Sequence, residues 1–99
     1  MEYTEAQIRR EVLVELAHSK SGTLTITELI DLLETRLKPT GHDAEIIDNR
    51  SDTFFSQKVR NTVSHRNNGT GLQANGLANY AADNESWTIT DKGRAAVNK

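Results

Sequence analysis

The stretch FSQKVRNTVSHRNNGTG, which runs from Phe55 to Gly71, begins as a helical pattern and ends in Asn and Gly. On a wheel of about 100° per residue, one side gathers the side chains expected to pack: Phe55, Val59, Thr62 and Val63. The other side gathers hydrogen-bonding side chains at spacing i, i+3, i+4 and i+7: Gln57, Arg60, Asn61 and Ser64. The pattern predicts an amphipathic helix followed by a loop.

The same stretch contains no acidic residue, although the chain of 99 residues has a formal net charge of −2. Residues 1–52 hold eleven acids and six bases, residues 53–82 hold three bases and no acid, and residues 83–99 hold three of each. This division indicates a negatively charged partner for the middle segment more clearly than the net charge does.

Two further amphipathic helices are predicted before this stretch. Thr4 and Gln7 form the pattern of a capping box, so the first helix begins after Thr4 and ends near Ser19. Thr27 precedes an apolar run and is expected to cap the second helix, which Pro39 ends.

Shorter segments with their own sequence patterns lie between the predicted helices. The β-branched residues 23–26 predict a brief strand, and residues 38–50 predict a loop. Ser51 or Asp52 is expected to cap the third helix, which contains the opening stretch.

The last third of the chain predicts a β-hairpin and a short helix. Residues 67–75 are expected to form a flexible connection, which could also become ordered over a phosphate. Strands are predicted at 76–80 and 87–90, on either side of a turn at 81–86, and a helix follows at 92–97.

The order helix, short strand, helix, helix, hairpin, helix predicts an α+β fold of the winged helix-turn-helix class. It would consist of a three-helix core, a β-hairpin wing and a short C-terminal helix, in one domain over residues 1–99. The composition also permits other small α+β folds.

Several classes of protein do not fit the sequence. No apolar run approaches the roughly 20 residues that span a membrane, the N-terminus is acidic and polar, and Cys is absent, so a cytoplasmic location is expected. Catalysis is not expected, because the sequence has neither a Gly-x-Ser-x-Gly elbow nor an Asp/Glu-x-Lys pair. Three widely spaced His residues predict no metal site, and no cofactor is expected.

The polar side of the third helix matches what duplex DNA presents. Arg pairs with guanine edges, and Asn and Gln pair with adenine edges. We therefore predict base contacts from Gln57, Arg60, Asn61 and Ser64. Flanking side chains are predicted to bind phosphates: Ser51, Thr53, Lys58, His65 and Arg66. The alternative is an ordinary solvated helix face.

Three segments, FFSQKVRNTVSHR, GLANY and WTITDKGRAA, give the chain a family resemblance over about residues 23–97. It resembles the winged-helix domains attached to restriction endonucleases, including methylation-dependent ones. The resemblance implies binding of double-stranded DNA, with the third helix in the major groove and the wing near the backbone or minor groove. It also implies a nuclease domain or a partner subunit, and in some relatives a reader of methylated adenine.

The predicted hairpin contains two aromatic residues, Tyr80 and Trp87. Trp87 and Tyr80 could contact DNA or a methylated base from the wing, although packing in the core is the simpler interpretation of Trp87. The alternative functions are a winged-helix adaptor that binds protein through the acidic residues 1–52, or a transcriptional regulator without modification specificity.

Overall fold

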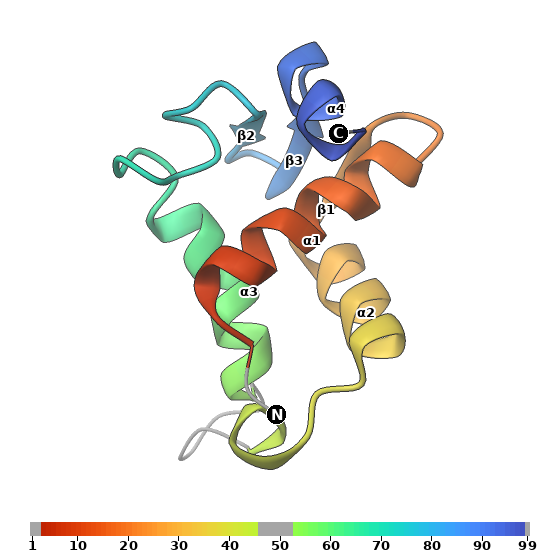
Figure 1. Ribbon diagram of the computed structural model, residues 1–99, viewed down its shortest axis with the longest axis vertical. Helices are drawn as coiled ribbons and strands as arrows, with labels where there is room; N and C mark the ends of the chain where they lie inside the picture. Colours follow the sequence, from red (N-terminus) through yellow and green to blue (C-terminus); the bar gives the residue numbers. More distant parts are fainter. Residues whose placement is uncertain (1–2, 46–52, 99) are drawn as a thin grey trace.

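The computed structural model describes residues 3–45 and 53–98 (Figure 1). Within these ranges the elements are α1 (Glu5–His18), β1 (Thr23–Thr25), α2 (Ile26–Leu37), the 310 helix η1 (Gly41–Ala44), α3 (Phe54–Ser64), β2 (Ala78–Ala81), β3 (Ser86–Ile89) and α4 (Asp91–Val97). The chain is a small α+β domain in which α1 crosses between α2 and α3, and the sheet lies toward one end of these helices (Figure 1).

Reciprocal capping boxes set the starts of the first two helices. The predicted box of α1 is confirmed: the Thr4 hydroxyl accepts from the Gln7 N–H, and the Gln7 side chain accepts from the Thr4 N–H. The predicted Thr27 cap of α2 is wrong. Thr25 caps this helix because its hydroxyl accepts from the Glu28 N–H while the Glu28 carboxylate accepts from the Thr25 N–H.

The third helix is capped by a residue other than the two predicted. Thr53 accepts from the Ser56 N–H at 3.0 Å, and the Ser56 hydroxyl accepts from the Thr53 N–H at 2.9 Å. This pairing satisfies two backbone donors at once, so the helix begins at Phe54. The predicted caps, Ser51 and Asp52, lie outside the described residues.

The three strands form one antiparallel sheet in the order β1-β3-β2. The central strand β3 pairs Thr88 with Thr23 of β1 and Trp87 with Tyr80 of β2. The hairpin was correctly expected, but β2 begins two residues later than predicted, and α4 begins at Asp91. The turn between β2 and β3 is shortened to residues 82–85, where Glu85 has a positive φ of 51°.

The core lies where β3 meets α1 and α3. Trp87 is 0% exposed and donates its Nε1–H to the Thr62 hydroxyl of α3 at 3.3 Å. Its ring also meets Tyr80 edge to face, with the ring centroids 5.4 Å apart. The predicted packing side of α3 is confirmed at Phe55, Val59 and Thr62, which are all buried.

Residues 67–75, predicted as a flexible connection that could also become ordered over a phosphate, form a loop with its own hydrogen bonds. The Asn75 side chain donates to the carbonyl oxygens of Gly69 and Gly71 at 3.0 and 2.8 Å. Leu72 is 1% exposed and anchors the loop in the core. A Cβ on Gly71 would lie 2.3 Å from the carbonyl oxygens of His65 and Arg66, so this position requires Gly.

The close approach of α4 to the segment before β2 gives a test of this packing. A Cβ on Gly93 would lie 2.1 Å from the Leu77 carbonyl oxygen and 2.8 Å from Ile89 Cγ1. Gly93→Ala should therefore lower the free energy of unfolding by about 1–3 kcal/mol in urea titrations. Gly69→Ala is the matched control, because nothing lies within 4 Å of its added methyl group. Equal stability of the two variants would contradict the packing described.

Candidate nucleic-acid interface

Gln57, Asn61 and Ser64 are accessible members of the predicted polar stripe on α3. Ser64 is exposed, and the two amide residues are partly exposed. Gln57 donates its Nε2–H to Asn61 Oδ1 at 3.0 Å. Within the described residues, the Gln57 carbonyl oxygen and the Asn61 amino group make no side-chain hydrogen bond. An acceptor on Gln57 and a donor on Asn61 thus remain available, and these are the two kinds of group that an adenine edge bonds.

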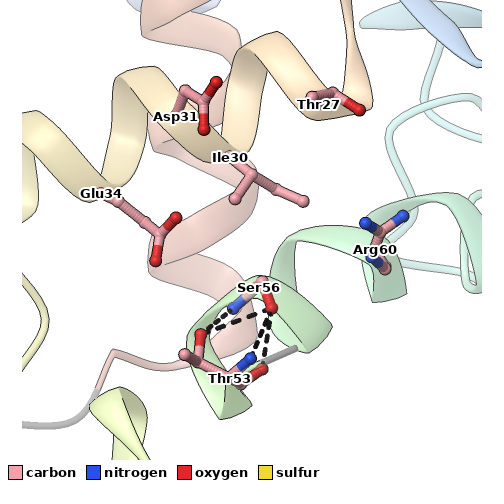
Figure 2. A pocket seen from close by; sticks show the side chains of 7 residues that line it. All are labelled: Thr27, Ile30, Asp31, Glu34, Thr53, Ser56 and Arg60. Carbon is pink, nitrogen blue, oxygen red and sulfur yellow. Dashed lines mark hydrogen bonds between the residues drawn. The ribbon is translucent and has the colours of Figure 1, made fainter. Parts of the chain in front are cut away.

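Arg60 belongs to the same stripe but lies at its edge, between two hollows. The first, of about 150 Å³, separates α2 from α3 and is lined by Thr27, Ile30, Asp31, Glu34, Thr53, Ser56 and Arg60. Figure 2 shows Glu34 and Ile30 extending from α2 toward the turn of α3 that holds Thr53 and Ser56. The second, of about 190 Å³, lies beside the hairpin and is lined by Ile26, Arg60, Val63, Ser64, Tyr80 and Glu85.

Acidic side chains from other elements line the same two hollows as Arg60. Asp31 and Glu34 share the first hollow with its guanidinium-bearing side chain, and Glu85 shares the second. Residues 53–82 contain no acidic residue, but acidic side chains from other parts of the chain line hollows beside α3 in the fold. Counting charges along the chain missed this, because α2 and the hairpin turn approach α3 from opposite sides.

Lys58 is engaged inside the protein. Its Nζ donates to Asp43 Oδ1 at 2.5 Å and to the Tyr3 carbonyl oxygen at 2.7 Å. Asp43 is 0% exposed, while the Lys58 side chain is 22% exposed. The ion pair joins α3 to η1 and to the residues before α1. Sequence analysis placed Lys58 at a phosphate; in the structure its ammonium has an internal role.

The other predicted phosphate ligands lie near the two ends of α3. The Thr53 hydroxyl serves as the helix cap, and Ser51 lies outside the described residues. At the far end, His65 Nδ1 lies 3.1 Å from Glu5 Oε1. Arg66 donates from Nη1 to the Val63 carbonyl oxygen at 2.7 Å, and its Cζ lies 5.2 Å from the centre of the Tyr80 ring.

The two aromatic side chains of the hairpin differ in access. Trp87 is buried, so the core interpretation is confirmed, and a base could not stack on it unless the core opened. Tyr80 is partly exposed and lines the second hollow. Tyr80 and Arg66 are therefore the accessible groups where the hairpin meets α3.

Burial raises the pKa of Glu34 above its ordinary value of 4.5, and the neighbouring Asp31 carboxylate raises it further. A raised folded-state pKa means that the folded protein holds this proton more tightly than the unfolded chain does. The charged form of Glu34 therefore lowers stability at neutral pH, and this loss disappears as the pH falls below 4.5.

The described residues contain neither a metal-binding cluster nor a membrane-spanning helix. No three His, Asp or Glu side chains in residues 3–45 and 53–98 gather closely enough to hold a metal ion. None of the helices in these ranges is both long and apolar enough to cross a membrane. Comparisons with family models, curated proteins and solved structures found no match to this chain.

Removing the Lys58 ammonium should destabilise the fold. Lys58→Met keeps an apolar stem but takes the positive charge away from a buried carboxylate. We expect a loss of roughly 2–4 kcal/mol in the free energy of unfolding, toward the lower end of what breaking a buried pair costs, because Lys58 is partly exposed. Lys20→Met, at an exposed position, is the control. A loss below about 0.5 kcal/mol, typical of surface changes, would contradict this role.

The raised pKa of Glu34 predicts a variant that is more stable than the parent. Glu34→Gln should raise the thermal unfolding midpoint at pH 7, because it removes a charge that burial disfavours. The gain should shrink as the pH is lowered and vanish below 4.5. Asp83→Asn removes the same charge from an exposed turn and serves as the control. A gain that does not depend on pH would contradict the explanation.

Proposed function

We propose that this protein binds double-stranded DNA as a winged helix, with α3 in the major groove. The observation that carries the proposal is the accessible row of Gln57, Asn61 and Ser64 on α3, within a segment that has no acidic residue. A major groove admits an α-helix and offers base edges to amides and hydroxyls.

The arrangement of the elements supports this proposal. Three helices precede the β2–β3 hairpin, and β1 joins the hairpin through β3 to give the order β1-β3-β2. In a winged helix the third helix enters the groove and the hairpin lies beside it as the wing. Here Tyr80 of β2 and Glu85 of the hairpin turn line a hollow together with Arg60 and Ser64 of α3, so the hairpin lies against α3 at that point.

The proposal assigns DNA contacts to fewer residues than the sequence predicted. Gln57 and Asn61 are assigned to an adenine edge, Arg60 and Ser64 to neighbouring bases, and His65 and Arg66 to phosphates. Lys58 and Trp87 are left out, because one is in an internal ion pair and the other is buried. No catalytic step is assigned to this chain.

The acids near Arg60 shape the kind of binding expected. Asp31, Glu34 and Glu85 reduce the positive potential at α3, so attraction to phosphates alone should be modest. Discrimination between sequences should then depend on hydrogen bonds to bases. The resemblance to restriction-associated winged helices makes adenine methylation the first modification to compare.

A protein-binding adaptor is the second candidate, and one observation favours it. Leu32 of α2 is a large apolar side chain that is 42% exposed, and Glu28 and Asp31 are exposed on the same helix. An apolar residue among acids suits a basic protein partner. Measuring the affinity at increasing salt concentration distinguishes the two functions, because binding to phosphates weakens steeply as the salt concentration rises.

The test is a selection from a randomised duplex library, with and without adenine methylation, followed by titration of the selected duplex. Asn61→Ala should reduce the preference for the selected duplex over a scrambled one by about 1–3 kcal/mol. Arg10→Ala, at an exposed position of α1, should leave the preference unchanged. Absence of binding to any duplex at low salt would refute the proposal and leave the adaptor.

A further inference from the structure

Residues 67–70, which follow α3, form the exposed tip of the loop described above. We propose that this tip is a second DNA contact, which binds phosphates of the same duplex that α3 reads. The inference rests on the proposed function and extends it from the helix to the loop. All four tip residues are exposed: Asn67, Asn68, Gly69 and Thr70.

The loop is held in shape by its own hydrogen bonds. The Ala74 N–H donates to the Arg66 carbonyl oxygen at 2.9 Å, and the Gly71 N–H donates to that of Asn68 at 2.8 Å. Gln73 links the loop to β2, because its Oε1 accepts from the Tyr80 N–H at 3.0 Å. A preformed loop loses little conformational entropy when it binds, so even a few contacts can contribute to affinity.

The tip also offers donors of the kind that bind phosphates. Within the described residues, the backbone N–H groups of Gly69 and Thr70 donate no hydrogen bond. The side chains of Asn68 and Thr70 likewise make no hydrogen bond within residues 3–45 and 53–98. Backbone N–H groups and short polar side chains supply many of the phosphate contacts in protein–DNA complexes.

The charges around the loop favour an anionic partner. Residues 67–82 contain no charged side chain at all. Arg66 lies at the beginning of the loop, and the stem of Lys92 lies beside its end, because a Cβ on Gly76 would be 3.8 Å from Lys92 Cδ. The loop therefore has a cationic residue near each end and no carboxylate of its own, while Glu5 lies beside His65 just before the loop.

The position of the loop fits the backbone of a bound duplex. Figure 1 shows the loop beyond the C-terminal end of α3 and beside β2. An α-helix of 11 residues is about 16 Å long at 1.5 Å per residue, and the major groove is about 12 Å wide. A helix in this groove brings the segment after its last turn to the groove edge, where the phosphates lie.

The test changes the charge of Thr70 and measures binding to the selected and scrambled duplexes. Thr70→Glu should weaken binding to both by roughly five- to tenfold at moderate salt, because a carboxylate would face phosphates. Thr70→Lys should strengthen binding to both and steepen the slope of log affinity against log salt by about one. Asn68→Glu should repeat the loss at a neighbouring exposed position.

Ala95→Glu and Ala95→Lys, at an exposed position of α4, are the matched controls and should change affinity little. If the Thr70 variants behave like the Ala95 variants while the parent protein binds DNA, the loop contact is refuted and the role of α3 stands. If the parent protein binds no duplex at low salt, both proposals fall.

Discussion

The buried Trp87 side chain fixes the position of α3, and the candidate interface depends on that position. Trp87 lies on the central strand of the sheet, its Nε1–H reaches Thr62 of α3, and its ring meets Tyr80 of the neighbouring strand. An indole N–H that is fully buried needs a hydrogen-bond acceptor, so the Thr62 hydroxyl ties the helix to the sheet at a defined height and rotation. This rotation turns Gln57, Asn61 and Ser64 outward, because the helix packs through the side that carries Phe55, Val59 and Thr62.

A second interaction, made by Lys58, connects α3 to other parts of the chain. It changes how the basic residues of this helix are interpreted. The Lys58 ammonium is engaged by the buried Asp43 carboxylate and the Tyr3 carbonyl oxygen, while the Arg66 guanidinium bonds Val63 and lies over Tyr80. The Lys58 charge, paired with a carboxylate, stabilises the fold and adds less to the field outside, whereas these partners of Arg66 carry no opposite charge. The three bases of residues 53–82 therefore do not act as a simple positive patch. The acids that approach Arg60 from α2 and the hairpin turn weaken that patch further.

Sequence reasoning predicted those features that local interactions decide. The Thr4 capping box, the hairpin and the buried side of α3 depend on residues near one another in the chain, and each was found. The start of α2 was misplaced because Thr25 and Thr27 are both good caps, and only the reciprocal bond with Glu28 distinguishes them. The pairing of Lys58 with Asp43 spans 15 residues and depends on how η1 packs, so no local pattern could reveal it. The hydrogen bonds within the loop were not predicted, because Asn and Gly also build turns whose bonds cross several residues.

These constraints make a coherent case for recognition by shape and hydrogen bonding more than by charge. If the chain binds DNA as proposed, its net charge of −2 gives little long-range attraction, and we expect its non-specific binding to be weak. A rigid helix and a rigid loop can compensate, because groups already held in position lose little entropy on binding. The amide pair on α3 would then contribute most where the base edges match it, and the neutral loop would add contacts that any duplex can satisfy. Such a division favours selectivity, since the sequence-independent part of the binding energy stays small.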